Sequence, residues 1–384
     1  METKRKPKSI VSIFFGFSAV ILFLEFSFNL SKPQYEKDNE NELQQLFFFN
    51  PKDSVGANPY NPLTTNNRLS IYYPYNTTNT GSKLNRKIPK IIVQSSDDAT
   101  IEGSKYELLS KKWIEMNPTY KYIYQSQDQL IESMIDTFRD TVPEVTATLQ
   151  LLPDKRLRGQ FAKYLFLYLN GGTLVDTDVF PRKPIDEWYG SNEDIGFVTT
   201  VDSDTINVWK YAETPDDLVR LKLGTFFMRS KPHHPILRRM ICTIIYTTFE
   251  ARKIGKLNTF FAYSDSVMDV DHCAITSVAS WVGNVMVTNV LFSYFNSLVN
   301  PTVTDFHIGK RLISVHSSEG PRLNHGEGFN WLTFTSIKEP ILVDDILVLP
   351  FVSFRKKAKA CEQYCYGTYL NGGSWKISSL RGQY

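Results

Sequence analysis

The sequence lacks the short motifs that mark several large enzyme classes. It contains no G-x-S-x-G nucleophile elbow, no G-x-G-x-x-G fingerprint and no Walker loop. Hydrolases of the nucleophile-elbow type, dinucleotide-dependent enzymes and P-loop enzymes therefore have no support. The chain also lacks a strong charge of either sign, because 43 Lys and Arg stand against 40 Asp and Glu. With a net charge of only +3 and no basic stripe, nothing indicates a nucleic-acid surface.

Cysteine is scarce as well. The four cysteines, Cys242, Cys273, Cys361 and Cys365, form no paired C-x-x-C knuckles, which argues against a structural zinc site. In an oxidising compartment we expect one or two disulfides among them. Their spacing assigns no pairing.

Residues 10–30 form one long apolar run, with a single charge, Glu25, near its far end. About 20 apolar residues cross a bilayer core as a helix, so we predict one transmembrane helix here. Basic residues within residues 1–9 precede the run and acidic residues follow it, which places residues 1–9 in the cytoplasm. A cleaved signal peptide is the alternative, but the run is long and no small-x-small site closes it.

Residues 31–86 are rich in Asn, Pro, Lys, Thr and Tyr and show no sustained periodicity. This composition predicts a lumenal stem that holds a globular domain away from the membrane. Asn76-Thr77-Thr78 is a glycosylation sequon, and in a lumenal stem we expect Asn76 to carry a glycan. The remaining residues, 87–384, suit one large catalytic domain, since 42% of the chain is hydrophobic and 14% is aromatic.

Expected strands and helices alternate at the start of this domain. Residues 88–94 and 120–125 have the pattern of strands, and residues 104–116 and 128–138 have the spacing of helices. Such alternation predicts an α/β domain with a mostly parallel sheet covered by helices.

A strongly amphipathic pattern over residues 154–170 predicts a helix, which Gly171-Gly172 ends by permitting a left-handed cap. Residues 173–176 then form a short strand, so Asp176-Thr177-Asp178 lies at a carboxyl strand end, where open α/β sheets bind ligands. D-x-D occurs three times in the chain, but only this copy follows a helix, a glycine pair and a strand. Asp176 and Asp178 suit Mn²⁺ or Mg²⁺, which prefer oxygen ligands. A capped solvent loop is the alternative.

The stretch from Gln160 to Asp178, QFAKYLFLYLNGGTLVDTD, resembles the D-x-D region of glycosyltransferase family 32, which includes fungal α-1,6-mannosyltransferases. Further similar stretches follow in family order at residues 88–94, 183–188, 231–237, 345–350 and 373–376. The resemblance implies a GT-A-like, Rossmann-type mixed sheet flanked by helices. It also implies a single-pass type II protein of the Golgi membrane with a lumenal catalytic domain.

The resemblance further implies the reaction and its residues. Mannose would pass from GDP-mannose to an α-mannoside of N-glycans or mannan, forming α-1,6 linkages with retention. Asp178 would bind Mn²⁺ or Mg²⁺ directly, and Asp176 would contact the metal shell or the ribose. The residues implied in donor binding are Gln94, Gln160, Lys163, Asp176 and Trp375.

The chain departs from the family at several of these positions. Gln160 and Lys163 stand where Asp and Arg are usual, and being three residues apart they share a helix face that we expect to point toward the donor. Gln160 would accept a hydrogen bond with a neutral carbonyl, and Lys163 would lack the bidentate fork of arginine. Ser96, Leu174 and Tyr369 differ as well. Two alternatives therefore stay open: a catalytically weak binding subunit of a Golgi mannan-synthesising complex, and a transferase for another nucleotide-hexose.

Overall fold

The protein is described here from a computed structural model of the whole chain. The residues it describes are 62–73, 87–189, 195–205, 219–255, 257, 278–298, 303–305, 311–312, 328–355 and 363–370. All of them belong to one compact unit, residues 52–384. The expected cytoplasmic tail and transmembrane helix, the sequon at Asn76, and Trp375 lie outside the described residues. Within the described ranges, no helix has the length and apolar character needed to cross a bilayer.

The first part of the domain follows the predicted alternation of strands and helices. Its elements are β1 (Ile91–Ser96), α4 (Glu107–Met116), β2 (Lys121–Ser126), α5 (Gln127–Phe138), α6 (Pro143–Leu151), α7 (Lys155–Asn170), β3 (Gly172–Val175), β4 (Val179–Pro181) and the 3-10 turn η2 (Ile185–Glu187). The sequence analysis did not predict α6. This helix is short and begins at Pro143. It buries only Val145, Thr148 and Leu149, so its apolar periodicity in the sequence is weak.

The second part adds the remaining strands and the long helices. Its elements are β5 (Phe197–Asp204), β6 (Leu221–Leu223), β7 (Phe227–Ser230), α9 (Pro235–Lys253), α10 (Val278–Trp281), α11 (Asn284–Asn296), β8 (Val303–Asp305), β9 (Arg311–Leu312), α12 (Trp331–Phe334), β10 (Ile341–Val343), β11 (Ile346–Leu349), η5 (Phe351–Phe354) and β12 (Gly367–Tyr369).

One large sheet joins the two parts. Its strand order is β2-β1-β3-β7-β5-β11-β10-β8-β9, with β6 beside β5, while β4 and β12 form a separate antiparallel pair. Strands β2, β1 and β3 are parallel, as is the pair β5 and β11, but β7 runs antiparallel between β3 and β5. The predicted α/β class and mixed sheet are confirmed, whereas the parallel pattern is limited to these two groups.

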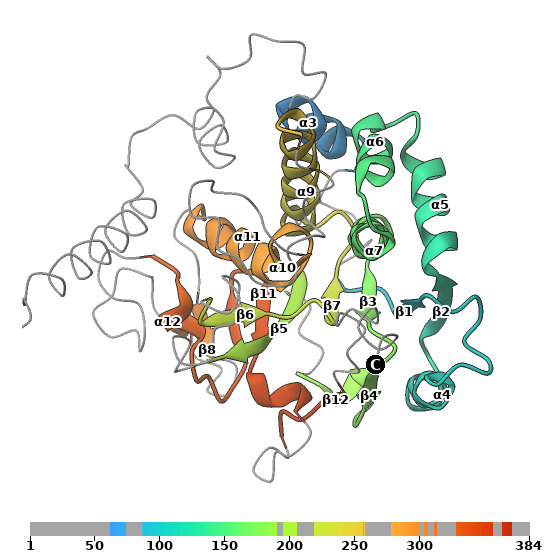
Figure 1. Cartoon of the computed structure of the whole chain (residues 1–384). Coiled ribbons are helices and arrows are strands. Elements are labelled where there is room, and N and C mark those ends of the chain that lie inside the picture. Colours follow the sequence, from blue (N-terminus) through green and yellow to red (C-terminus); the bar gives the residue numbers. More distant parts are fainter. Residues whose placement is uncertain are drawn as a thin grey trace, which may run out of the picture. The chain divides into compact units, whose positions relative to one another are not determined.

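Helices cover one face of this sheet and a smaller layer covers the other. Figure 1 shows α7, α9, α10 and α11 on one side, and α4 with the β4–β12 pair on the opposite side. Helix α7 is buried at every residue from Gly159 to Tyr168, because it lies between the sheet and helices α5 and α9. This burial holds α7 firmly against the sheet.

The glycine pair after α7 has positive φ angles, but Gly171, with ψ −162°, does not adopt the predicted left-handed cap. Gly171 and Gly172 have φ angles of 64° and 102°, a region that side chains disfavour. A Cβ on Gly172 would also lie 2.9 Å from the Ile91 carbonyl oxygen, because β3 passes close to β1 here. Glycine therefore allows the chain to leave α7 and enter the sheet at once.

Part of the range predicted as the stem, residues 31–86, has regular structure. They contain α3 (Pro62–Tyr72), which packs against α9. Leu69 is fully buried, and the Tyr168 hydroxyl donates hydrogen bonds to the carbonyls of Leu69 and Tyr73. The helix buries few residues, so its sequence carries little periodicity, and only the tertiary contacts with α9 and Tyr168 reveal it.

The expectation of disulfides fails for two of the four cysteines. Cys242 on α9 and Cys365 before β12 are both buried free thiols. Burial raises the pKa of the Cys242 thiol to about 12, which keeps it protonated. Cys273 and Cys361 lie outside the described residues.

Candidate active site

The D-x-D residues form a tight turn between β3 and β4. The Asp176 amide donates to the Phe226 carbonyl at 2.8 Å, and the Val179 amide donates to the Asp176 carbonyl at 3.1 Å. The Leu370 amide, just after β12, donates to the Asp178 carbonyl at 3.0 Å. The structure therefore does not support a loosely held solvent loop, because three segments of the chain hold this turn and Asp178 is only 5% exposed.

Gln94, which was predicted to contact the donor, hydrogen-bonds to the D-x-D turn. Its side chain is fully buried on β1, and its Nε2 donates to the Asp176 carbonyl at 3.1 Å. Its Oε1 accepts hydrogen bonds from the Ser110 and Tyr122 hydroxyls, both at 2.7 Å. Gln94 therefore positions the turn from beneath.

Lys163 lies where the sequence predicts, beside the D-x-D turn. Helix α7 runs antiparallel to β3, so its N-terminal half reaches the carboxyl end of that strand. The Lys163 Nζ is 2.7 Å from Asp176 Oδ1, and the two side chains are 9% and 14% exposed. This buried ion pair balances the charge of Asp176 and holds its carboxylate in place.

Gln160 lies one turn earlier on the same helix and is 3% exposed. The Tyr164 hydroxyl is beside it and donates to the Val282 carbonyl at 2.7 Å, which ties α7 to the segment before α11. Burial raises the pKa of Tyr164, so its hydroxyl stays protonated. Gln160 Nε2 forms no hydrogen bond of normal geometry with a described residue, but its interaction with the Tyr164 hydroxyl opposes part of the rise in the Tyr164 pKa.

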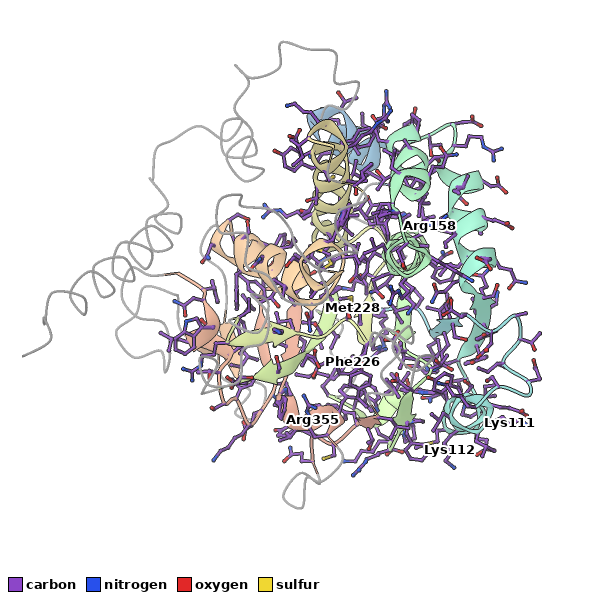
Figure 2. The ribbon with its side chains drawn as sticks, viewed as in Figure 1. Lys111, Lys112, Arg158, Phe226, Met228 and Arg355 are labelled. Atoms are coloured by element: carbon purple, nitrogen blue, oxygen red, sulfur yellow. The ribbon has the colours of Figure 1, made fainter. Side chains whose placement is uncertain are left out.

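Aromatic residues form the opposite side of the turn. Phe226 and Tyr369 stack with ring centroids 4.1 Å apart and planes 8° from parallel. Arg355 donates to the Asp202 carbonyl, and its guanidinium lies over the Phe351 ring. Burial lowers the pKa of Arg355. Figure 2 shows Phe226 and Arg355 on the side of the sheet that carries the β4–β12 pair.

The sequence analysis did not single out Phe226, Arg355 or Lys105. Lys105 lies in the segment between β1 and α4, and its hydrogen bond to Tyr106, with weaker attraction to Asp98 and Asp178, raises its pKa. These residues are 48 to 250 positions apart from one another or from the turn they surround, and no local motif connects them. One signal in the sequence could have indicated Lys105 as a site residue: it lies in the segment after β1, and ligands bind at the carboxyl ends of such strands.

The other positions that differ from the family have partners within the protein. The Ser96 hydroxyl is 2.8 Å from the Tyr124 hydroxyl and accepts a hydrogen bond from the Asp98 amide. Leu174 is buried on β3. The small Ser96 side chain and the buried Leu174 side chain therefore present no exposed aromatic ring at these two positions.

The second described D-x-D, Asp202-Ser203-Asp204, has a structural role. Asp204 accepts hydrogen bonds from the Thr335 hydroxyl at 2.9 Å and the Ser336 amide at 2.6 Å. Asp202 accepts one from the Asn284 side chain at 2.9 Å. Sequence context had favoured the first D-x-D over this one.

The first D-x-D fits a divalent cation in part. Carboxylate oxygens are ligands for hard ions such as Mn²⁺ and Mg²⁺. In the described part of the chain no group of three His, Cys, Asp or Glu could hold a metal by itself. A cation at this turn would therefore need oxygens from water and from a bound phosphate, which is how Mg²⁺ is commonly held in proteins.

Comparison with known proteins agrees with this site. Residues 103–194 match the family described as "Glycosyltransferase sugar-binding region containing DXD motif". An initiation-specific α-1,6-mannosyltransferase of Candida albicans is 26% identical, over 83% of this chain and 78% of that protein. The putative glycosyltransferase HOC1 of Saccharomyces cerevisiae is 28% identical, over 76% of this chain and 63% of that protein.

A third relative, an initiation-specific α-1,6-mannosyltransferase of Saccharomyces cerevisiae, is 21% identical over 98% of this chain and 96% of that protein. These relatives and the D-x-D family match cover the part of the chain that builds the turn at Asp176 and Asp178. The chain is therefore an enzyme, a glycosyltransferase with a D-x-D sugar-binding region, related to the α-1,6-mannosyltransferases of family 32.

Proposed function

We propose that this chain transfers mannose from GDP-mannose to an α-mannoside of an N-glycan or mannan, forming an α-1,6 linkage with retention. The observation that carries the proposal is the D-x-D turn, which presents the buried carboxylate of Asp178 and the partly buried carboxylate of Asp176 at the carboxyl end of β3. The names of the relatives supply the sugar and the linkage. A GT-A-like fold is part of the proposal, since the parallel β2-β1-β3 group ends at this site.

Asp178 would be the protein ligand of Mn²⁺ or Mg²⁺, because Asp176 already forms the ion pair with Lys163. A bound divalent cation would stabilise the negative charge of the leaving diphosphate. The chain's own residues would support the same charge: Lys105 is close enough to Asp178 to interact with it electrostatically. Phe226 and Leu370 hold the turn by their backbone groups, so little reorganisation is needed during the reaction.

The proposal includes a retaining reaction without a protein nucleophile, because an α-linked donor would give an α-linked product. We assign no carboxylate to the role that the nucleophile has in retaining glycosidases. The acceptor hydroxyl would attack from the face that the diphosphate leaves, and a phosphate oxygen would take the hydroxyl proton. The protein would then act mainly by positioning the two substrates and stabilising charge.

We also propose a single-pass type II protein of the Golgi membrane, with residues 1–9 cytoplasmic and the described domain lumenal. The support is the one-sided distribution of basic residues around the apolar run at residues 10–30. Endoglycosidase treatment of microsomes should raise gel mobility, and Asn76→Gln should abolish that shift. Digestion of the catalytic domain by protease in sealed vesicles would contradict this topology.

The transfer assay uses the full-length chain in detergent, with GDP-mannose and an α-mannoside acceptor. We expect product with Mn²⁺, none with a chelator, and none from Asp178→Asn, because an amide is a poorer ligand for a hard ion. Binding of GDP-mannose without transfer, in a folded protein, would instead favour the binding-subunit function. Transfer from another nucleotide-hexose only would replace the donor in the proposal.

A further inference from the structure

Three polar side chains meet at the carboxyl end of β5, and the donor site described above gives them no role. The Asn284 side chain, at the start of α11, donates to Asp202 Oδ2 at 2.9 Å. The Arg355 guanidinium, just after η5, donates to the Asp202 carbonyl. All three residues are half-buried. They belong to three separate segments of the chain, so only the packing of the domain brings them together.

Each of these side chains keeps hydrogen-bonding atoms that the protein does not use. Within the described part of the chain, Asp202 Oδ1 and Asn284 Oδ1 accept no hydrogen bond, and Arg355 uses one nitrogen of its guanidinium. Asp204 differs, since both of its carboxylate oxygens accept hydrogen bonds from residues just after α12. In this second D-x-D, Asp204 is therefore satisfied by the protein, whereas Asp202 has one oxygen left to bind a ligand.

The sheet places this cluster on the same edge as the first D-x-D. Strands β3 and β5 both run antiparallel to β7, so they run parallel to each other and end at one edge. Gly172 on β3 and Phe197 on β5 both pair with Ser230. Five residues further along each strand, Thr177 and Asp202 therefore reach about the same level. They are two strand spacings apart, about 10 Å, which is the scale of two neighbouring sugar rings.

The chemistry of the cluster suits an uncharged sugar. A carboxylate and an amide oxygen accept hydrogen bonds from sugar hydroxyls, and a guanidinium donates to sugar oxygens. The charges of Asp202 and Arg355 offset each other, and the carboxylate repels a phosphate. Arg355 lies over the Phe351 ring and interacts electrostatically with Tyr369. Because Tyr369 stacks on Phe226, aromatic rings connect this cluster with the D-x-D turn.

We propose that Asp202, Asn284 and Arg355 bind the acceptor sugar, with Asp202 Oδ1 accepting a hydrogen bond from one of its hydroxyls. The inference rests on the proposed function, and it names the residues that select the acceptor. The donor sugar would lie at the D-x-D turn after β3, and the acceptor would lie two strands away, at the end of β5. A bound acceptor without the matching hydroxyl leaves the carboxylate oxygen unpaired, so this subsite discriminates between acceptors.

The experiment compares Asp202→Asn with Asp204→Asn, its neighbour in the same D-x-D. Asp202→Asn keeps the side-chain size and an oxygen for Asn284, but it replaces the unused acceptor with an amide donor. Arg355→Met, which removes the guanidinium, is the second variant. KM values for GDP-mannose and for methyl α-mannoside are measured on the full-length chain with Mn²⁺, together with the hydrolysis of GDP-mannose by water. The dissociation constant of methyl α-mannoside in the presence of GDP and the melting temperature are measured for each protein.

We expect Asp202→Asn to raise the KM and the dissociation constant of methyl α-mannoside about tenfold, or about 1.4 kcal/mol. The KM for GDP-mannose, the rate of hydrolysis and the melting temperature should stay unchanged. Arg355→Met should weaken acceptor binding as well. Asp204→Asn should lower the melting temperature, because its oxygens bind the protein, and should leave both acceptor constants unchanged.

Unchanged acceptor constants in Asp202→Asn, while the wild type transfers mannose, would overturn the inference and leave the proposed function standing. An equal loss for donor and acceptor, or an equal loss in Asp204→Asn, would also overturn it, because the effect would then come from the fold of this sheet edge. Wild-type binding of methyl α-mannoside that depends on Asp202, without turnover of GDP-mannose, would support the inference and refute GDP-mannose as the donor. If the wild type binds no α-mannoside, the inference fails whatever the donor.

Discussion

Replacing Lys163 by methionine should destabilise the protein strongly. The substitution keeps most of the side-chain volume but removes the cation 2.7 Å from Asp176 Oδ1, where the two side chains are 9% and 14% exposed. Removing one partner of a buried ion pair costs about 3–5 kcal/mol, because the remaining charge is buried without compensation. Since both groups retain slight exposure, we expect the free energy of unfolding to fall by about 3 kcal/mol, the low end of this range.

Thermal unfolding of the full-length chain measures this loss, which corresponds to a fall of roughly 6–10 °C. The double variant Lys163→Met/Asp176→Asn should recover most of it, because the buried carboxylate is then gone. Lys155→Met on the same helix is the control. Lys155 is 37% exposed and pairs with Asp97 and Asp128, which are 67% and 68% exposed, so its loss should be under about 1 kcal/mol.

Two results would refute this reasoning. One is a Lys163→Met protein that melts within about 2 °C of Lys155→Met, which would mean that water solvates the Asp176 carboxylate. The other is a double variant no more stable than the single one. The loss would then come from packing of the Lys163 stem against the sheet rather than from charge.

Asp178→Asn should abolish Mn²⁺-dependent transfer while circular dichroism stays unchanged, and wild-type turnover would contradict the metal assignment. Trp113→Ala should cost about 3–5 kcal/mol in urea unfolding, because the indole is fully buried and its Nε1 donates to a backbone carbonyl at 2.8 Å; a loss under about 1 kcal/mol would contradict this packing. Cys242, whose pKa burial raises to about 12, should resist iodoacetamide at about pH 8.5 until the protein unfolds, and rapid native labelling would disprove its burial. Burial and the charge of Asp345 raise the pKa of Asp344, so its ionised form opposes folding and Asp344→Asn should raise the melting temperature at neutral pH. That gain should vanish below about pH 3, where the carboxyl is protonated in both the folded and unfolded states, and a gain that persists there would point to a backbone effect at φ 55° instead.

The sequence by itself was sufficient for the local unit that leads to the site. Helical spacing predicted α7, the glycine pair predicted its end, and the short apolar run predicted β3 with Asp176 and Asp178 after it. These features depend on periodicity and on the backbone freedom of glycine, which act between residues close in the chain. The same locality places Gln160 and Lys163 on one face of α7, whereas the ion pair of Lys163 with Asp176 was not predicted.

Only the tertiary structure decided what each of these side chains does. Gln94 was predicted to contact the donor, and the structure shows its Nε2 donating to the D-x-D turn while its Oε1 accepts from Ser110 on α4 and Tyr122 on β2. Phe226, which holds Asp176, lies 50 residues after it in the chain. Leu370, which holds Asp178, lies 192 residues after it. Whether a polar side chain is satisfied by the protein or left for a ligand depends on such long-range neighbours, which packing brings together and local sequence patterns do not encode.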